Sequence, residues 1–244
     1  NKSNNIDKAL LDTTNSRRYY SEMWLSSCYM QLGKIKEAQA ISPDYYMVPP
    51  IDRRLTVESD RFSELSNMFA QAGNLERALE YALRCADIEK QVAGKEHIWY
   101  GNSTIIIGNL YYALGDSINA EENYLINKNI CKHTYGEYSE RYVDALLSLA
   151  SVNTDFSMKD GLDKATRYLD EAYSIAHKRY PLLEAQIVNQ QSVIAFRNKN
   201  YEQAKTLMMQ ALSLCELAEG KTSNNYEILL SNTIDLYQMF GQYD

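Results

Sequence analysis

Few residues of this chain have the types and spacing that catalysis or metal binding requires. The three histidines, His97, His133 and His177, belong to no His-x-x-x-His pair and to no Ser-His-Asp order. Adjacent carboxylates at 121–122 and 170–171 could serve acid/base chemistry, but they fall in expected outer helices, where charge usually marks a solvated face. No Walker-type or dinucleotide glycine cluster occurs. We therefore expect a chain that is not an enzyme and that holds no cofactor and no metal.

The cysteines also give no indication of a metal site. Cys28, Cys85, Cys131 and Cys215 lack the spacing of metal ligands, so buried reduced thiols are the expected state.

Net charge and hydrophobic content limit the kinds of partner that we expect. The net charge is −7, from 25 basic and 32 acidic residues, which argues against nucleic acid because phosphate binding needs a basic surface. With 45% hydrophobic residues the chain is too apolar for disorder, yet it contains no run of roughly 18 apolar residues. We expect no membrane insertion within this segment. The chain begins without Met and stops just after Gly241, so we expect both ends to be cuts in a longer protein, and its compartment stays open.

The elements that would position any binding residue are helix pairs. In the stretch 101–124, apolar residues at helical spacing run to Leu114, Gly115 offers the positive φ that ends a helix, and Ala120 and Tyr124 begin a new apolar stripe. A small residue at the position of Ala120 lets two helices approach closely. It recurs 40, 42, 45 and 39 residues apart, at Ala38, Ala78, Ala120, Ala165 and Ala204. The period indicates a repeat protein.

A second column has the same period. Gly94, Gly136 and Gly220 lie 42 and 84 residues apart, and each opens a polar linker. Together the columns predict a single array over 1–244. Its parts are a partial repeat with a first pair (1–42), a proline-rich connection (43–52), four pairs (53–94, 95–136, 137–178, 179–220) and a truncated sixth pair (221–244). We expect a three-residue insertion within 155–161, and a turn on Asn200 in the left-handed conformation.

These residues resemble the tetratricopeptide repeat, whose pattern they match in five of six columns by size or chemistry, the six residues being Thr104, Ile107, Gly108, Tyr111, Ala120 and Tyr124. The linker and first helix, with Gly94, His97 and Leu110-Tyr111-Tyr112, are similar to the long repeats of kinesin light chains and of bacterial proteins in which such arrays precede a caspase-like CHAT peptidase. The resemblance implies an all-α, right-handed α-solenoid of about five to six antiparallel helix pairs.

The resemblance also implies a function in protein–protein interaction. Its first helices would line a concave groove that binds a peptide or protein segment, and the positions not used for packing are Asp60, Glu64, Asn67, Asn102, Ile106, Asn109, Tyr112, Asp144, Ser148, Ser151, Gln186, Asn189 and Gln190. Amide side chains both donate to and accept from a peptide backbone. The acidic members, with no Lys or Arg among them, favour a neutral or basic partner. Two alternatives stay open: a sensory or regulatory N-terminal region of a larger effector, either a caspase-like peptidase or a signalling or transcription regulator, and a purely structural spacer.

Overall fold

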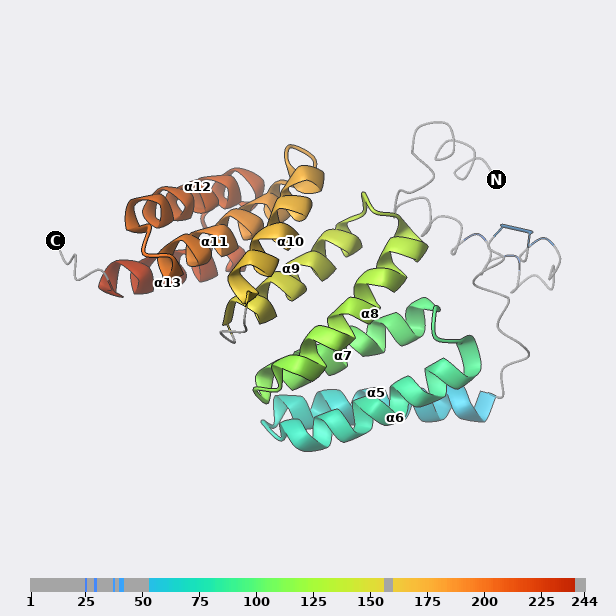
Figure 1. Ribbon diagram of the computed structural model, residues 1–244. Helices are drawn as coiled ribbons and strands as arrows, with labels where there is room; N and C mark the ends of the chain where they lie inside the picture. Colours follow the sequence, from blue (N-terminus) through green and yellow to red (C-terminus); the bar gives the residue numbers. More distant parts are fainter. Residues whose placement is uncertain are drawn as a thin grey trace. The chain divides into compact units, whose positions relative to one another are not determined.

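The computed structural model describes residues 53–155 and 160–239, together with residues 25, 29, 37, 40 and 41. Within the two long ranges every regular element is an α-helix (Figure 1). The predictions for the first pair, the proline-rich connection and the end of the chain lie outside these ranges, as does most of the expected insertion. The helices are α5 (Arg53–Gln71), α6 (Leu75–Ala93), α7 (Ile98–Ala113), α8 (Ser117–Tyr135), α9 (Glu140–Asp155), α10 (Gly161–Ala176), α11 (Pro181–Arg197), α12 (Tyr201–Glu219) and α13 (Asn224–Met239).

The chain divides into two compact units, residues 1–145 and 146–244, with the division inside α9. In the first unit α5 contacts α6, α6 contacts α7, and α7 contacts α8 (Figure 1). In the second unit α10 contacts α11, α11 contacts α12, and α12 contacts α13. Contacts thus join helices that follow one another in sequence, as in repeat proteins. The single array and its repeat boundaries stay predictions.

A glycine turn joins α5 to α6 and α7 to α8, the two helix pairs described in the first unit. Gly115 has φ +83°, its N–H donates to the carbonyl of Tyr112 at 3.1 Å, and the N–H of Asp116 donates to Tyr111 at 2.9 Å. These are the two bonds of the Schellman motif, which satisfies carbonyls left over at a helix end. Gly73 repeats the geometry after α5 with φ +75°. The positive φ predicted for Gly115 is confirmed.

The prediction that Asn200 takes the left-handed conformation is wrong. Lys199 has φ +62° and occupies the place of Gly115 in the same pair of hydrogen bonds, while Asn200 has φ −86°. Asn200 instead stands at the N-cap of α12, the position that Asp116 holds before α8. The sequence was misleading because Asn suits both the left-handed and the N-cap position.

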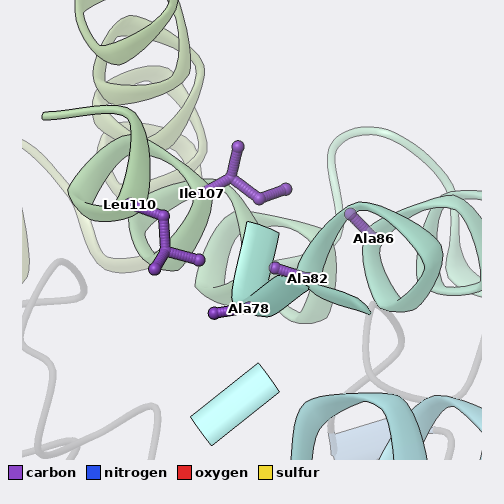
Figure 2. Packing of buried hydrophobic residues seen from close by; sticks show 5 residues of the cluster. All are labelled: Ala78, Ala82, Ala86, Ile107 and Leu110. Carbon is purple, nitrogen blue, oxygen red and sulfur yellow. The ribbon is translucent and has the colours of Figure 1, made fainter. Parts of the chain in front are cut away.

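The alanine column forms the close contacts between helices. Ala78, Ala120, Ala165 and Ala204 each have 0% of their surface exposed. Figure 2 shows Ala78, Ala82 and Ala86 along α6 beside Ile107 and Leu110 of α7, and these five residues form one buried cluster. Small side chains along α6 allow α7 to approach, so its larger residues fill the space between the helices. The role predicted for Ala120 agrees with its burial.

The contact between α7 and α8 depends on a glycine within α7. A Cβ atom at Gly108 would lie only 2.6 Å from Cε1 of Tyr124. The Tyr124 ring therefore rests directly on the α7 backbone, and its hydroxyl donates to Oδ1 of Asn109 at 2.9 Å.

The second glycine column stands at the C-terminal ends of α6, α8 and α12. Gly94, Gly136 and Gly220 have φ between +84° and +95° with ψ between 160° and 168°, a backbone region that is essentially reserved for glycine. At the same period the missing member is Lys178, which has φ +59°. Glu184 of α11 supports that turn: its Oε2 accepts from the Lys178 N–H at 3.0 Å, and its Oε1 lies 2.7 Å from Nδ1 of His177.

Candidate peptide-binding surface

The groove residues predicted in the first unit form stripes on two helices. Asp60, Glu64 and Asn67 are exposed on α5, at a spacing that places them on one side of the helix. On α7, Asn102 and Asn109 are exposed, whereas Ile106 and Tyr112 are half-buried. Asp144, in the first turns of α9, is exposed.

Two of these residues also take part in the fold. Oδ1 of Asn109 accepts the hydrogen bond from the Tyr124 hydroxyl, so only its amide NH₂ is left for a ligand. Ile106 packs against the cluster that Figure 2 shows, together with Tyr111. The sequence treated both positions as unused for packing, and in this respect the structure corrects it. For Asn109 the reason is that the Tyr124 ring lies against Gly108 and its hydroxyl reaches the next residue of α7.

The predicted residues of the second unit are half-buried. Ser148 and Ser151 lie on α9, and Gln186, Asn189 and Gln190 lie on α11. Nε2 of Gln190 donates to Oγ of Ser151 at 3.0 Å and to the Leu147 carbonyl at 3.4 Å. This bridge brings Ser151 and Gln190 together and holds α9 beside α11.

Two amide oxygens on α11 lack hydrogen bonds. Oδ1 of Asn189 and Oε1 of Gln190 are buried and find no partner among the described residues. A buried acceptor without a donor costs roughly 1–3 kcal/mol, so a donor supplied by a bound chain would be favourable there. Peptide N–H groups are such donors.

A polar cluster that the sequence did not predict lies inside the first unit. Cys85 of α6 is buried, with Oγ of Ser59 at 3.3 Å and Oγ of Ser103 at 3.6 Å from its sulfur. Glu89, one turn further along α6, is half-buried, and burial raises the pKa of its carboxyl group. Its Oε2 finds no hydrogen-bond partner among the described residues.

The repeat pattern of the sequence already marks Glu89 as an unusual residue for its position. Counted from the alanine column, Glu89 takes the position that Cys131, Ala176 and Cys215 hold in the other described pairs. Those three residues are at most 4% exposed. A carboxylate has replaced a small core residue, and such a replacement is uncommon without a partner for the charge.

The described residues show little sign of catalytic chemistry. No group of three or more His, Cys, Asp or Glu among them could hold a metal ion. Cys85, Cys131 and Cys215 are free and buried, as expected, and Cys28 lies outside the described residues. Burial raises the pKa of the Cys131 thiol to about 11, which leaves it a poor nucleophile. None of the described helices is long and apolar enough to cross a bilayer.

Comparison with known proteins identifies the repeat in two segments of the chain. Two segments match family models described as tetratricopeptide repeat, at residues 60–98 and 185–216. No curated protein matches the sequence.

Solved structures extend the likeness beyond these two segments. A structure of kinesin light chain TPR-like repeats from Podosopora anserina is 18% identical, covers 78% of this chain and 87% of its own, and gives a TM-score of 0.59. BtubC (BKLC) from P. vanneervenii is 13% identical, with coverages of 85% and 84% and a TM-score of 0.61. The apo form of RapI is 13% identical, with coverages of 91% and 84% and a TM-score of 0.59. At these identities the likeness is one of fold, and it confirms the all-α solenoid class expected from the sequence.

Proposed function

We propose that this chain, which carries tetratricopeptide repeats, is a non-catalytic scaffold that binds a peptide or protein segment along the first helices of its pairs. The observation that carries the proposal is the pair of unpartnered amide oxygens on α11, Asn189 Oδ1 and Gln190 Oε1. Their helix face is held in place by the bridge from Gln190 to Ser151. Because both oxygens are buried, an extended chain would place its N–H groups on them after the two amide side chains turn outward from α11.

The acidic residues of the predicted surface indicate the charge of the partner. The predicted surface includes Asp60, Glu64 and Asp144 and no lysine or arginine. A neutral or basic segment would meet attraction there, and an acidic one would meet repulsion. Nucleic acid would meet the same repulsion.

The test is selection of ligands from a displayed random-peptide library on the purified chain, followed by affinity measurements with fluorescein-labelled synthetic copies of the selected peptides. Asn189→Ala should weaken binding about tenfold, the loss expected for one or two hydrogen bonds to a desolvated site. Gln210→Ala is the matched control, because Gln210 is an exposed amide residue on α12, the second helix of the same pair. Equal affinities for both variants and the parent would place the binding surface elsewhere.

The predicted binding residues on α7 are tested separately. The double variant Asn109→Ala/Tyr112→Ala should also abolish binding of peptides that contact α7. This variant should in addition lose unfolding free energy, because it removes the hydrogen bond that Asn109 accepts from Tyr124, a loss of about 1 kcal/mol by itself, and truncates the half-buried Tyr112. Binding losses are therefore compared at a temperature where the variant is fully folded. The alternative of a regulatory region in a larger effector stays a prediction, which the gene sequence past Asp244 tests.

A further inference from the structure

A hollow of about 230 Å³ opens between α5, α6 and the start of α7 in the first unit. Its polar lining is Ser59, Asp60 and Glu89, and its apolar lining is Ile88, Val92 and Trp99. Sites for whole small molecules usually measure roughly 300–1,000 Å³. The hollow is smaller than that range and is suited to a single side chain.

The described lining of the hollow is acidic and carries no positive charge. Two of the six residues are carboxylates, and none of these six described lining residues is basic. Oε2 of Glu89 is buried without a hydrogen-bond partner among the described residues. Burial is the largest influence on the pKa of the Glu89 carboxyl group and raises it. Hydrogen bonds with Ser103 and Cys85 lower the pKa in part, the charge of Asp60 raises it, and the net shift is upward. A cation entering the hollow would supply the missing partner.

We propose that this hollow receives an arginine side chain of the polypeptide bound by the scaffold, an inference that rests on the function proposed above. Asp60 belongs to both surfaces, since it lines the hollow and is a member of the predicted groove. The apolar residues Ile88 and Val92 suit the methylene stem of a long basic side chain, whose head then reaches the polar groups.

Arginine fits this lining better than lysine does. Its guanidinium presents five donors in a plane, which can serve Glu89, Asp60 and the Ser59 hydroxyl together. Trp99 adds an indole ring, the aromatic system that attracts cations most strongly, and arginine makes such contacts more often than lysine. Acidic and phosphorylated segments are disfavoured by the same two carboxylates.

The direct test uses N-acetyl-arginine methylamide as the probe and its neutral isostere N-acetyl-citrulline methylamide as the comparison. In the full chain with Trp24→Phe, Trp99 is the only tryptophan, so its fluorescence reports on the hollow. We expect a saturable change with the arginine probe, a weaker response with the lysine analogue and none with citrulline. Equal responses to arginine and citrulline would overturn the inference.

Glu89→Gln should weaken binding of the arginine probe about tenfold or more, because it removes the buried charge while keeping the shape. Glu122→Gln is the matched control, since it makes the same charge change at an exposed position on α8. The melting temperature of Glu89→Gln without probe should equal or exceed that of the parent. A lower value would show that groups of this same chain already stabilise the Glu89 carboxylate, and would overturn the inference.

The peptides selected for the scaffold separate the two proposals. Peptides that lose affinity in Asn189→Ala but keep it both in Glu89→Gln and after an arginine-to-citrulline exchange would refute the arginine hollow and leave the scaffold function intact. A saturable arginine response that Glu89→Gln abolishes, in a chain that selects no peptide, would support the hollow and count against the scaffold function.

Discussion

Gly108→Ala tests how α7 and α8 pack. A methyl group at residue 108 would lie 2.6 Å from Cε1 and 2.7 Å from Cδ1 of Tyr124, distances at which carbon atoms overlap. The Tyr124 side chain has little room to retreat, because it is only 3% exposed and its hydroxyl is bonded to Asn109. Either the ring tilts and loses that hydrogen bond, or the two helices move apart.

The cost follows from three contributions. Overpacking of this kind costs about 1–3 kcal/mol. The hydrogen bond to Asn109 adds about 1 kcal/mol if the ring tilts. Replacing glycine by alanine inside a helix recovers about 1 kcal/mol. We expect the variant to lose about 2 kcal/mol of unfolding free energy, roughly the middle of the overpacking range.

The assay is urea unfolding followed by Trp99 fluorescence in the Trp24→Phe background, since Trp99 lies at the start of α7 in the same unit. Gly101→Ala is the comparison within the same helix. There the added methyl group meets a single atom closer than 3 Å, Cγ2 of Ile130 at 2.9 Å. We expect a smaller loss for Gly101→Ala than for Gly108→Ala.

A double-mutant cycle identifies which way the structure yields. If the ring tilts, Tyr124→Phe should cost less in the Gly108→Ala background than in the parent, because its hydrogen bond is already lost. An unchanged urea midpoint for Gly108→Ala would refute the reasoning, since Tyr124 could not then lie against residue 108.

Further predictions concern turns, charge and a thiol. Both Lys199 and Gly115 have positive φ, so Lys199→Gly should raise the unfolding free energy by about 1 kcal/mol and Gly115→Val should lower it by about 2 kcal/mol. A lower urea midpoint for Lys199→Gly, or an unchanged or higher one for Gly115→Val, would contradict this. Burial raises the pKa of Glu89 above its usual 4.5, so the folded state holds that proton more tightly than the unfolded state and the parent loses stability as pH rises through this window. Glu89→Gln should therefore match the parent below pH 4.5 and become increasingly more stable toward neutral pH, whereas parallel pH profiles would exclude a raised pKa. Burial raises the pKa of Cys131 to about 11, and at pH 8 iodoacetamide should modify it at least about a hundredfold more slowly in the folded chain than in urea, as mass spectrometry of the digested protein would show.

The features that the sequence predicted correctly are those that one residue's own chemistry decides. Gly115 ends its helix at φ +83° because few other residues adopt that backbone. Ala120 is buried because only a small side chain fits between two close helices. Such requirements repeat with the period of the fold, so they can be found without knowing the contacts.

The features that the sequence missed depend on pairs of residues from different helices. The turn at Lys178 needs Glu184, which lies in the next helix and accepts its N–H. Asn109 is drawn into the fold by Tyr124, fifteen positions further along the chain. Helical spacing alone places Asn109 on an exposed face, and it gives no hint that a tyrosine hydroxyl reaches that face.

Glu89 is unusual both in its position within the repeat and in its contacts, and it bears most directly on function. Its position in the repeat requires a small core residue, as Cys131, Ala176 and Cys215 show, and all three are buried. A carboxylate there keeps an oxygen without a partner among the described residues and favours its protonated form, which lowers stability at neutral pH. A scaffold that needed only to stack its helices would be more stable with cysteine or alanine at residue 89. The cost is understandable if the charge acts on a bound partner, so Glu89→Cys and Glu89→Ala should each stabilise the free chain and weaken its binding of arginine.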